Sequence, residues 1–124
     1  VKMSPELFVN EAVPNLFNTA FKPNKIAIKQ YKKIAFAISK QGIIAALEGM
    51  KNRMDREIVL KFAPYPVLFI VGKKDNILPY KELITQANLP EKGSFLMLEK
   101  SGHMGFVEAK KETFNVIKRF VLEN

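Results

Sequence analysis

Hydrophobic and polar residues follow a helical period through the first half of the chain. Ser4 and Pro5 predict a helix start, because serine is a favoured cap and proline fits the first turn. Pro14 predicts a kink or an end to that helix. A second helix is expected from Asn24, a cap candidate, and a third up to a break near Asp55. The expected inner faces are Ile28, Tyr31, Ala35 and Ile38 in the second helix, and Ile43, Ile44, Leu47 and Met50 in the third.

The pattern changes after Lys61. The run "YPVLFIVG" is β-branched and aromatic throughout and stops at Gly72, which is typical of a strand buried on both faces in a parallel sheet. A helix over "YKELITQANLP", a strand over "GSFLMLE" and a helix from Glu108 follow. The order strand, helix, strand, helix predicts an α/β fold with parallel strands and a right-handed crossover. The expected inner residues are Leu83, Ile84 and Ala87 in the first of these helices, and Phe114, Ile117 and Val121, with Phe120 beside them, in the last.

Composition narrows the class of protein. The 124 residues are 48% hydrophobic and 26% charged, which is typical of one soluble globular domain. The sequence has no cysteine, which excludes disulfides and thiolate chemistry and favours a reducing compartment. No apolar run reaches the roughly 18 residues of a membrane span, and "VKMSPELF" lacks the apolar core of a signal peptide. We therefore expect a cytoplasmic protein with no membrane partner.

The formal net charge of +8 raises the alternative of a nucleic-acid-binding module. However, only Arg53, Arg56 and Arg119 are arginines among the 20 basic residues, whereas phosphate recognition favours the guanidinium group. The lysines are scattered, and their densest groups lie opposite apolar stripes at helical spacing. The pattern favours a solvated lysine surface over a nucleic-acid partner.

Asp75 and His103 are the candidates for chemistry. Each lies in the loop that follows one of the two predicted strands, where open α/β sheets place their functional residues. Alone, Asp75 is better explained as a turn residue and His103 as a polar loop residue. On neighbouring parallel strands, however, the carboxylate can accept a hydrogen bond from one imidazole nitrogen while the other faces a cleft.

The two loops resemble motifs of the α/β-hydrolase family. "YPVLFIVGKKDNILP" is similar to the family's acid segment, with Pro66 introducing the strand, Asp75 as the triad acid and Pro79 beginning the next helix. "LEKSGHMGFVE" is similar to its histidine loop, with His103 at the triad position and Glu108 starting the last helix. The resemblance implies a helical cap at residues 1–61 and the C-terminal part of the hydrolase core at residues 62–124.

The nucleophile of that family is missing from this sequence. Family members place a serine in G-x-S-x-G ahead of the acid and the histidine, and none of Ser4, Ser39, Ser94 and Ser101 has glycines two positions before and after it. The oxyanion-hole segment is missing too. We therefore expect the C-terminal fragment of a longer hydrolase, which should be inactive alone.

For the intact protein, the resemblance implies hydrolysis of a small ester or related carbonyl compound by a Ser-His-Asp triad, without cofactor or metal. A non-catalytic hydrolase-fold protein that binds a ligand or partner remains an alternative, although retention of both Asp75 and His103 counts against it. A central strand needs a neighbour on each edge, and the sequence supplies one. We therefore expect either self-association or pairing with an N-terminal half.

Overall fold

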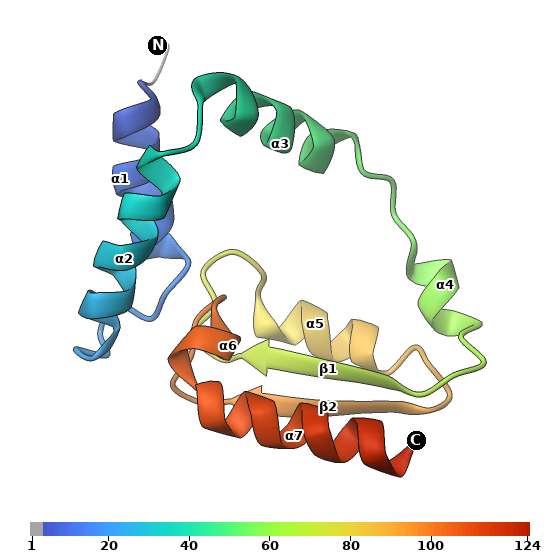
Figure 1. Ribbon diagram of the computed structural model, residues 1–124. Helices are drawn as coiled ribbons and strands as arrows, with labels where there is room; N and C mark the ends of the chain where they lie inside the picture. The colour runs from blue at the N-terminus through green and yellow to red at the C-terminus, as the bar shows by residue number, and fades with distance from the viewer. Residues whose placement is uncertain (1–3) are drawn as a thin grey trace.

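The computed structural model describes residues 4–124 and shows a group of helices beside a small parallel sheet that has helices of its own (Figure 1). The first three residues of the predicted 1–61 segment lie outside the described residues. The elements are α1 (Pro5–Asn15), α2 (Asn24–Phe36), α3 (Lys40–Asn52), α4 (Glu57–Lys61), β1 (Val67–Gly72), α5 (Tyr80–Ala87), β2 (Gly93–Leu98), α6 (Gly105–Glu108) and α7 (Lys110–Glu123). The predicted α/β class is confirmed, with helices first and the sheet after Lys61.

Helix α1 begins as the sequence predicts. The hydroxyl oxygen of Ser4 accepts a hydrogen bond from the main-chain N–H of Leu7 at 3.1 Å, which satisfies a donor in the first turn. Pro14 lies in the last turn, and the helix ends at Asn15.

The core of the helical half lies between α1 and α2. Val9, Val13 and Phe17 are buried there, and Phe17 is completely shielded from solvent. Three of the four residues predicted on the inner face of α2 pack against this cluster, namely Ile28, Tyr31 and Ala35. The fourth, Ile38, lies beyond the end of α2 and is half exposed.

Asn24 does not cap α2, contrary to the sequence prediction. It is the first helical residue, and the cap position is Pro23, which makes no side-chain capping bond. The Asn24 side chain is instead buried, and its amide donates to the carbonyl oxygen of Asn18 at 2.9 Å and to the carboxylate of Glu108 at 2.8 Å. The side chain therefore acts as a donor to these two oxygens, whereas a capping asparagine would accept a hydrogen bond from a main-chain N–H of the first turn.

Most of the predicted inner stripe of α3 is exposed. Ile43 packs against the α1–α2 core, but Ile44, Leu47 and Met50 are largely exposed to solvent. Figure 1 shows the reason, because α3 extends away from the α1–α2 pair toward α4 instead of folding back on it. The periodicity predicts the helix correctly but not what covers its apolar face.

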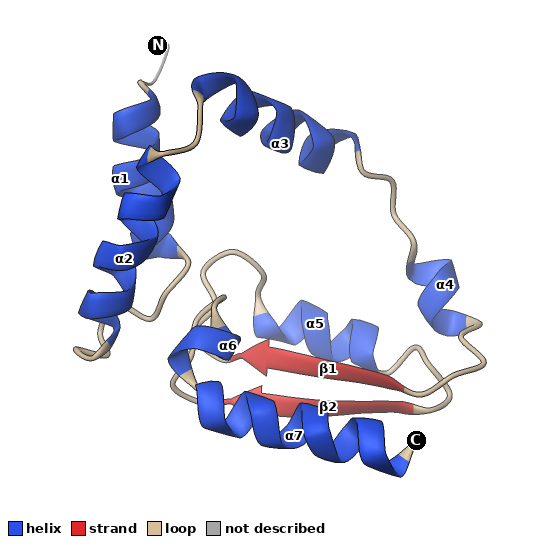
Figure 2. Cartoon of the chain, in the orientation of Figure 1, coloured by secondary structure: helices blue, strands red, loops and turns tan. Residues whose placement is uncertain are grey.

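The sheet consists of β1 and β2 in the described part of the chain, and they run parallel with Val67 opposite Gly93 and Gly72 opposite Leu98. Helix α5 connects the strands, and Figure 2 shows the two strands lying between α5 and α7. The predicted inner residues Leu83, Ile84 and Ala87 of α5 are partly or fully buried. The parallel order brings the carboxyl ends of both strands to one edge of the sheet.

The last helical segment departs from the prediction in two ways. It is split into α6 and α7 at Ala109, whose backbone is not helical, so Glu108 ends α6 instead of starting the final helix. The predicted inner stripe of Phe114, Ile117 and Val121 is also exposed, whereas Thr113 of the same helix is buried.

Candidate active site

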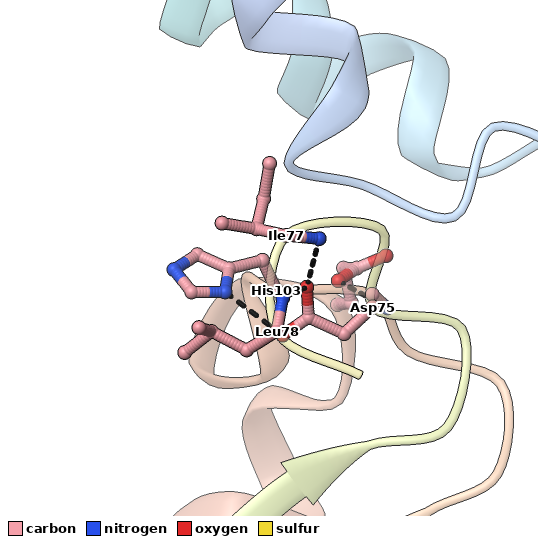
Figure 3. Close-up of polar contacts among 6 residues, drawn as sticks. Asp75, Ile77, Leu78 and His103 are labelled. Carbon is pink, nitrogen blue, oxygen red and sulfur yellow. Dashed lines mark hydrogen bonds and ion pairs between the residues drawn. The ribbon is translucent and has the colours of Figure 1, made fainter. Parts of the chain in front are cut away.

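The two predicted site residues meet at the carboxyl edge of the sheet. The Nδ1 atom of His103 lies 2.8 Å from Oδ2 of Asp75, a hydrogen bond between the loop after β2 and the loop after β1 (Figure 3). The sequence predicted this contact, and the structure confirms it.

Both oxygens of Asp75 have hydrogen-bond partners. Its Oδ1 atom accepts from the main-chain N–H groups of Ile77 at 2.7 Å and Leu78 at 3.0 Å, while Oδ2 faces His103. The side chain is only 4% exposed. One carboxylate therefore stabilises the turn that follows Asp75 and also orients the imidazole. Asp75 is both a turn residue and the partner of the histidine.

The imidazole keeps one nitrogen available. A carboxylate can only accept, so in the neutral ring Nδ1 carries the proton and Nε2 holds a free lone pair. Figure 3 shows the second ring nitrogen on the side away from Asp75, and the His103 side chain is 34% exposed. The ring is therefore oriented for proton transfer at Nε2.

Gly72 allows the two loops to approach each other. A Cβ atom at this position would collide with the carbonyl oxygen of Gly102 in the histidine loop. The main-chain N–H of Lys74 donates to the carbonyl oxygen of Ser101 at 2.9 Å across the same gap. The distance between the loops is therefore set by backbone contact, which fixes Asp75 relative to His103.

The histidine loop also rests on the end of α1. The N–H groups of His103 and Met104 both donate to the carbonyl oxygen of Leu16, at 2.9 and 3.2 Å. A Cβ atom at Gly102 would lie 2.8 Å from the backbone nitrogen of Asn18. Sequence reasoning missed this contact, because Leu16 looks like an ordinary core position in a sequence.

Glu108 is the other residue whose role the sequence did not reveal. Its carboxylate accepts hydrogen bonds from Gly102, six residues before it, and from Asn18 and Asn24, which are distant in the sequence. A lone glutamate near a glycine-rich loop carries no signal of such partners.

A cavity of about 380 Å³ borders the histidine and the aspartate. Its walls include Phe69 and Val71 of β1 and Phe106 of α6, so most of the lining is apolar. Sites for small molecules are of this size and combine apolar walls with few polar groups. The imidazole therefore faces a space that suits a small, largely apolar molecule.

Two of the four serines cap helices. Ser4 and Ser39 accept main-chain hydrogen bonds as helix caps, from Leu7 and from Gly42 at 3.1 Å. Ser101 is buried and Ser94 lies exposed in β2. Residues 4–124 contain no cluster of three or more acidic or histidine side chains that could hold a metal ion. Nor does this part of the chain include a helix long and apolar enough to cross a bilayer.

No protein-family model matches the chain, and no curated protein matches it in sequence. Solved structures do match. An esterase from Thermogutta terrifontis superposes with a TM-score of 0.88 at 23% identity, over 98% of this chain and 45% of the esterase. An esterase from Exiguobacterium antarcticum gives 0.78 at 16% identity, over 94% of this chain and 42% of that one. A meta-cleavage product hydrolase gives 0.74 at 13% identity, over 100% and 48%.

The chain therefore spans just under half the length of each of these three solved structures. Sequence identities of 13–23% show a shared fold and no more. The shared fold covers nearly all of this chain, including both loops of the site.

Proposed function

Because the chain has the fold of the C-terminal part of the α/β-hydrolases, we propose that it supplies the acid and the histidine of a serine-hydrolase active site. The nucleophile would come from a segment outside Val1–Asn124. The observation that carries the proposal is the 2.8 Å hydrogen bond between Asp75 and His103, with Nε2 left free beside an apolar cavity.

In the proposed reaction, Nε2 of His103 removes the hydroxyl proton as the serine attacks the substrate carbonyl. The imidazolium then returns this proton to the leaving alcohol, and an acyl-enzyme forms. Water deacylates it with the same histidine as base. Asp75 keeps the proton on Nδ1 and stabilises the imidazolium, for which its buried carboxylate is well placed.

The proposed substrate is a small ester or a related carbonyl compound. Two of the similar solved structures are named esterases and a third is a meta-cleavage product hydrolase, which supports hydrolysis of a carbonyl compound. The apolar walls contributed by Phe69, Val71 and Phe106 favour an acyl group without charge.

The domain organisation is part of the same proposal. Residues 1–61 would form the cap over the substrate and residues 62–124 the end of the hydrolase core. The α1–α2 pair supports this division, because it packs on the histidine loop through Leu16 and not on the sheet face. We also propose that the protein is cytoplasmic and binds no nucleic acid.

We further propose that the chain requires a partner, either an N-terminal half of the hydrolase or a second copy. The two-stranded sheet and the exposed apolar residues of α7 support this, with Phe114 at 62% and Val121 at 68% exposed. Burying such surface is favourable by about 25 cal/mol per Å².

Active-site labelling of the intact protein tests the function. A fluorophosphonate should label one serine outside Val1–Asn124, and His103→Ala should abolish that labelling. Exposed Ser94, already present in this chain, provides an internal control that should stay unlabelled. An intact protein that binds ligands but is never labelled would favour the non-catalytic alternative.

A further inference from the structure

Glu108 gathers three hydrogen-bond donors on one carboxylate. Its Oε2 atom accepts from the main-chain N–H of Gly102, and its Oε1 atom accepts from the main-chain N–H of Asn18 and the side-chain amide of Asn24. All three distances are 2.8 Å. Hydrogen bonds to a charged acceptor are the stronger kind, and here they are partly buried.

The donors come from three parts of the fold. Gly102 precedes the histidine in its loop, Asn18 lies in the connection between α1 and α2, and Asn24 is the first residue of α2. Asn18 also donates through its side chain to the carbonyl oxygen of Lys100 at 2.8 Å. Glu108 thus ties the histidine loop to the α1–α2 pair.

The short helix that carries Glu108 does not explain its partly buried charge. Helix α6 has only four residues, so Glu108 belongs to its first turn as well as its last, and a single turn has little dipole to act on the charge. Its carboxylate points to donors outside the helix instead, so tertiary contacts account for it.

The backbone on both sides of the histidine ring is held through these contacts. The N–H of Gly102 donates to Glu108, while those of His103 and Met104 donate to Leu16 of the α1–α2 pair. The ring is one-third exposed and is oriented by its bond to Asp75. Its alignment therefore depends on where the backbone of the loop is fixed.

We propose that Glu108 is a positioning residue for His103. It locks the histidine loop onto the α1–α2 pair and so keeps Nδ1 directed at Asp75, which couples docking of the helical segment to alignment of the imidazole. The consequence for catalysis rests on the proposed function, whereas the alignment itself can be measured in this chain.

Glu108→Gln is a sharp test because it preserves size and removes one acceptor. Whichever way the amide turns, its NH₂ group faces an N–H donor of Gly102 or of Asn18 and Asn24. Glu108→Asp keeps the charge with a shorter reach and should rescue part of the effect. Glu112→Gln, on the exposed side of α7, is the matched control.

The measurement is the tautomer of His103, the only histidine in the sequence, from the ¹⁵N shifts of its ring at a pH where the ring is neutral. The wild type and Glu112→Gln should show the Nδ1–H form. Glu108→Gln should shift toward the Nε2–H form that free imidazole prefers, with at least tenfold faster exchange of the Gly102 amide. Glu108→Asp should fall between them.

Asn24→Ala keeps the proposal testable if Glu108→Gln does not fold, since it removes one donor and leaves the carboxylate in place. A smaller shift in the same direction is expected. Folded Asn24→Ala and Glu108→Gln variants that both keep the Nδ1–H tautomer would overturn the positioning role.

In the intact hydrolase, Glu108→Gln should lower kcat more than it changes KM, because alignment of the base and not substrate binding is affected. A tautomer shift without any ester hydrolysis in the wild type would refute the proposed function alone. An unchanged tautomer in an active hydrolase would refute only the positioning role.

Discussion

The main-chain N–H of His103 donates to the carbonyl oxygen of Leu16 at 2.9 Å, which joins the histidine loop to the end of α1. The candidate catalytic loop is therefore built on the helical segment as well as on the sheet. Movement of α1 would displace the imidazole, so the helical half contributes to the geometry of the site and does more than cover it.

Asp75→Asn should reverse the tautomer of His103 while it keeps the turn. The asparagine oxygen can still accept from Ile77 and Leu78, but its NH₂ group would then face Nδ1, which must become an acceptor. In the intact protein, kcat should fall by about 10⁴-fold, because Nε2 would carry the proton and could not act as base.

Steady-state kinetics of the intact protein on a p-nitrophenyl ester would measure this loss. Asp55→Asn is the control, since Asp55 also accepts a main-chain hydrogen bond, from Glu57 at 2.9 Å, but lies exposed between α3 and α4. An equal loss of activity in both variants would point to misfolding instead of a tautomer change.

This chain alone should not hydrolyse esters above the background of free imidazole and lysine. It holds a histidine and an acid but no serine presented to them, since Ser101 is buried and Ser4 and Ser39 cap helices. Release of p-nitrophenol should be the same for wild type and His103→Ala. A rate that disappeared with His103 would reveal a nucleophile within these residues.

Gly72→Ala should prevent the two loops from closing. The added methyl group would collide with the backbone of Gly102, which cannot move without displacing the histidine loop. We expect a loss of stability at or above the 1–3 kcal/mol that is roughly typical of overpacking. Denaturant unfolding followed by circular dichroism would measure it.

Gly49→Ala provides the opposite control. Gly49 lies in α3, and an added Cβ would meet no atom within 4 Å apart from its chain neighbours and the backbone of its own helix. Alanine there should stabilise the chain by about 0.5–1 kcal/mol, because glycine is disfavoured inside a helix. A Gly72→Ala variant that is as stable as the wild type, or more stable, would show that the close approach at Gly72 is not limiting.

The ion pair between Lys73 and Glu99 links the same two loops at their exposed side, at 2.6 Å. The hydrogen bond to the Glu99 carboxylate and its charge raise the pKa of Lys73 above its ordinary value of 10.5. Because the pKa of Lys73 is higher in the folded than in the unfolded state, the ion pair stabilises the fold fully at pH values below the unfolded-state pKa. This stabilisation is lost as the pH rises through the folded-state pKa.

In the wild type, loss of this ion pair above about pH 10.5 should lower the melting temperature relative to neutral pH. Glu99→Gln removes the pair at every pH, so this drop should be smaller in the variant. The change should be small, since both side chains are largely exposed and such pairs contribute little. Thermal melts of both proteins across this range would measure it, and identical pH profiles would show that the pair adds nothing.

The sequence predicts the Asp75–His103 pair well because parallel strands end at one edge of a sheet, so local patterns suffice to bring two loops together. It does not predict Glu108, Leu16 or Asn24, whose partners are distant in sequence and leave no local periodicity. Asn24 is instructive, because its residue type and place favour a cap, yet it lies inside the helix and its amide donates to a carboxylate of α6. Apolar stripes likewise predict helices but not the surfaces that cover them.

The exposed stripe of α7 leads to the last prediction, which concerns association of this chain. Phe114 and Val121 are more than 60% exposed on one side of α7, and the described part of the sheet has two strands. Apolar surface of this kind is favourable to bury, and an open strand edge can pair with another chain. Sedimentation at micromolar concentration should therefore show a species larger than a monomer. Replacing Phe114 and Val121 together by glutamate should shift it toward monomer, while Lys118→Glu on the same helix, which changes charge without removing apolar area, should shift it less. A compact monomer that melts cooperatively in the wild type would show that the chain needs no partner, and would favour an independent domain over part of a larger hydrolase.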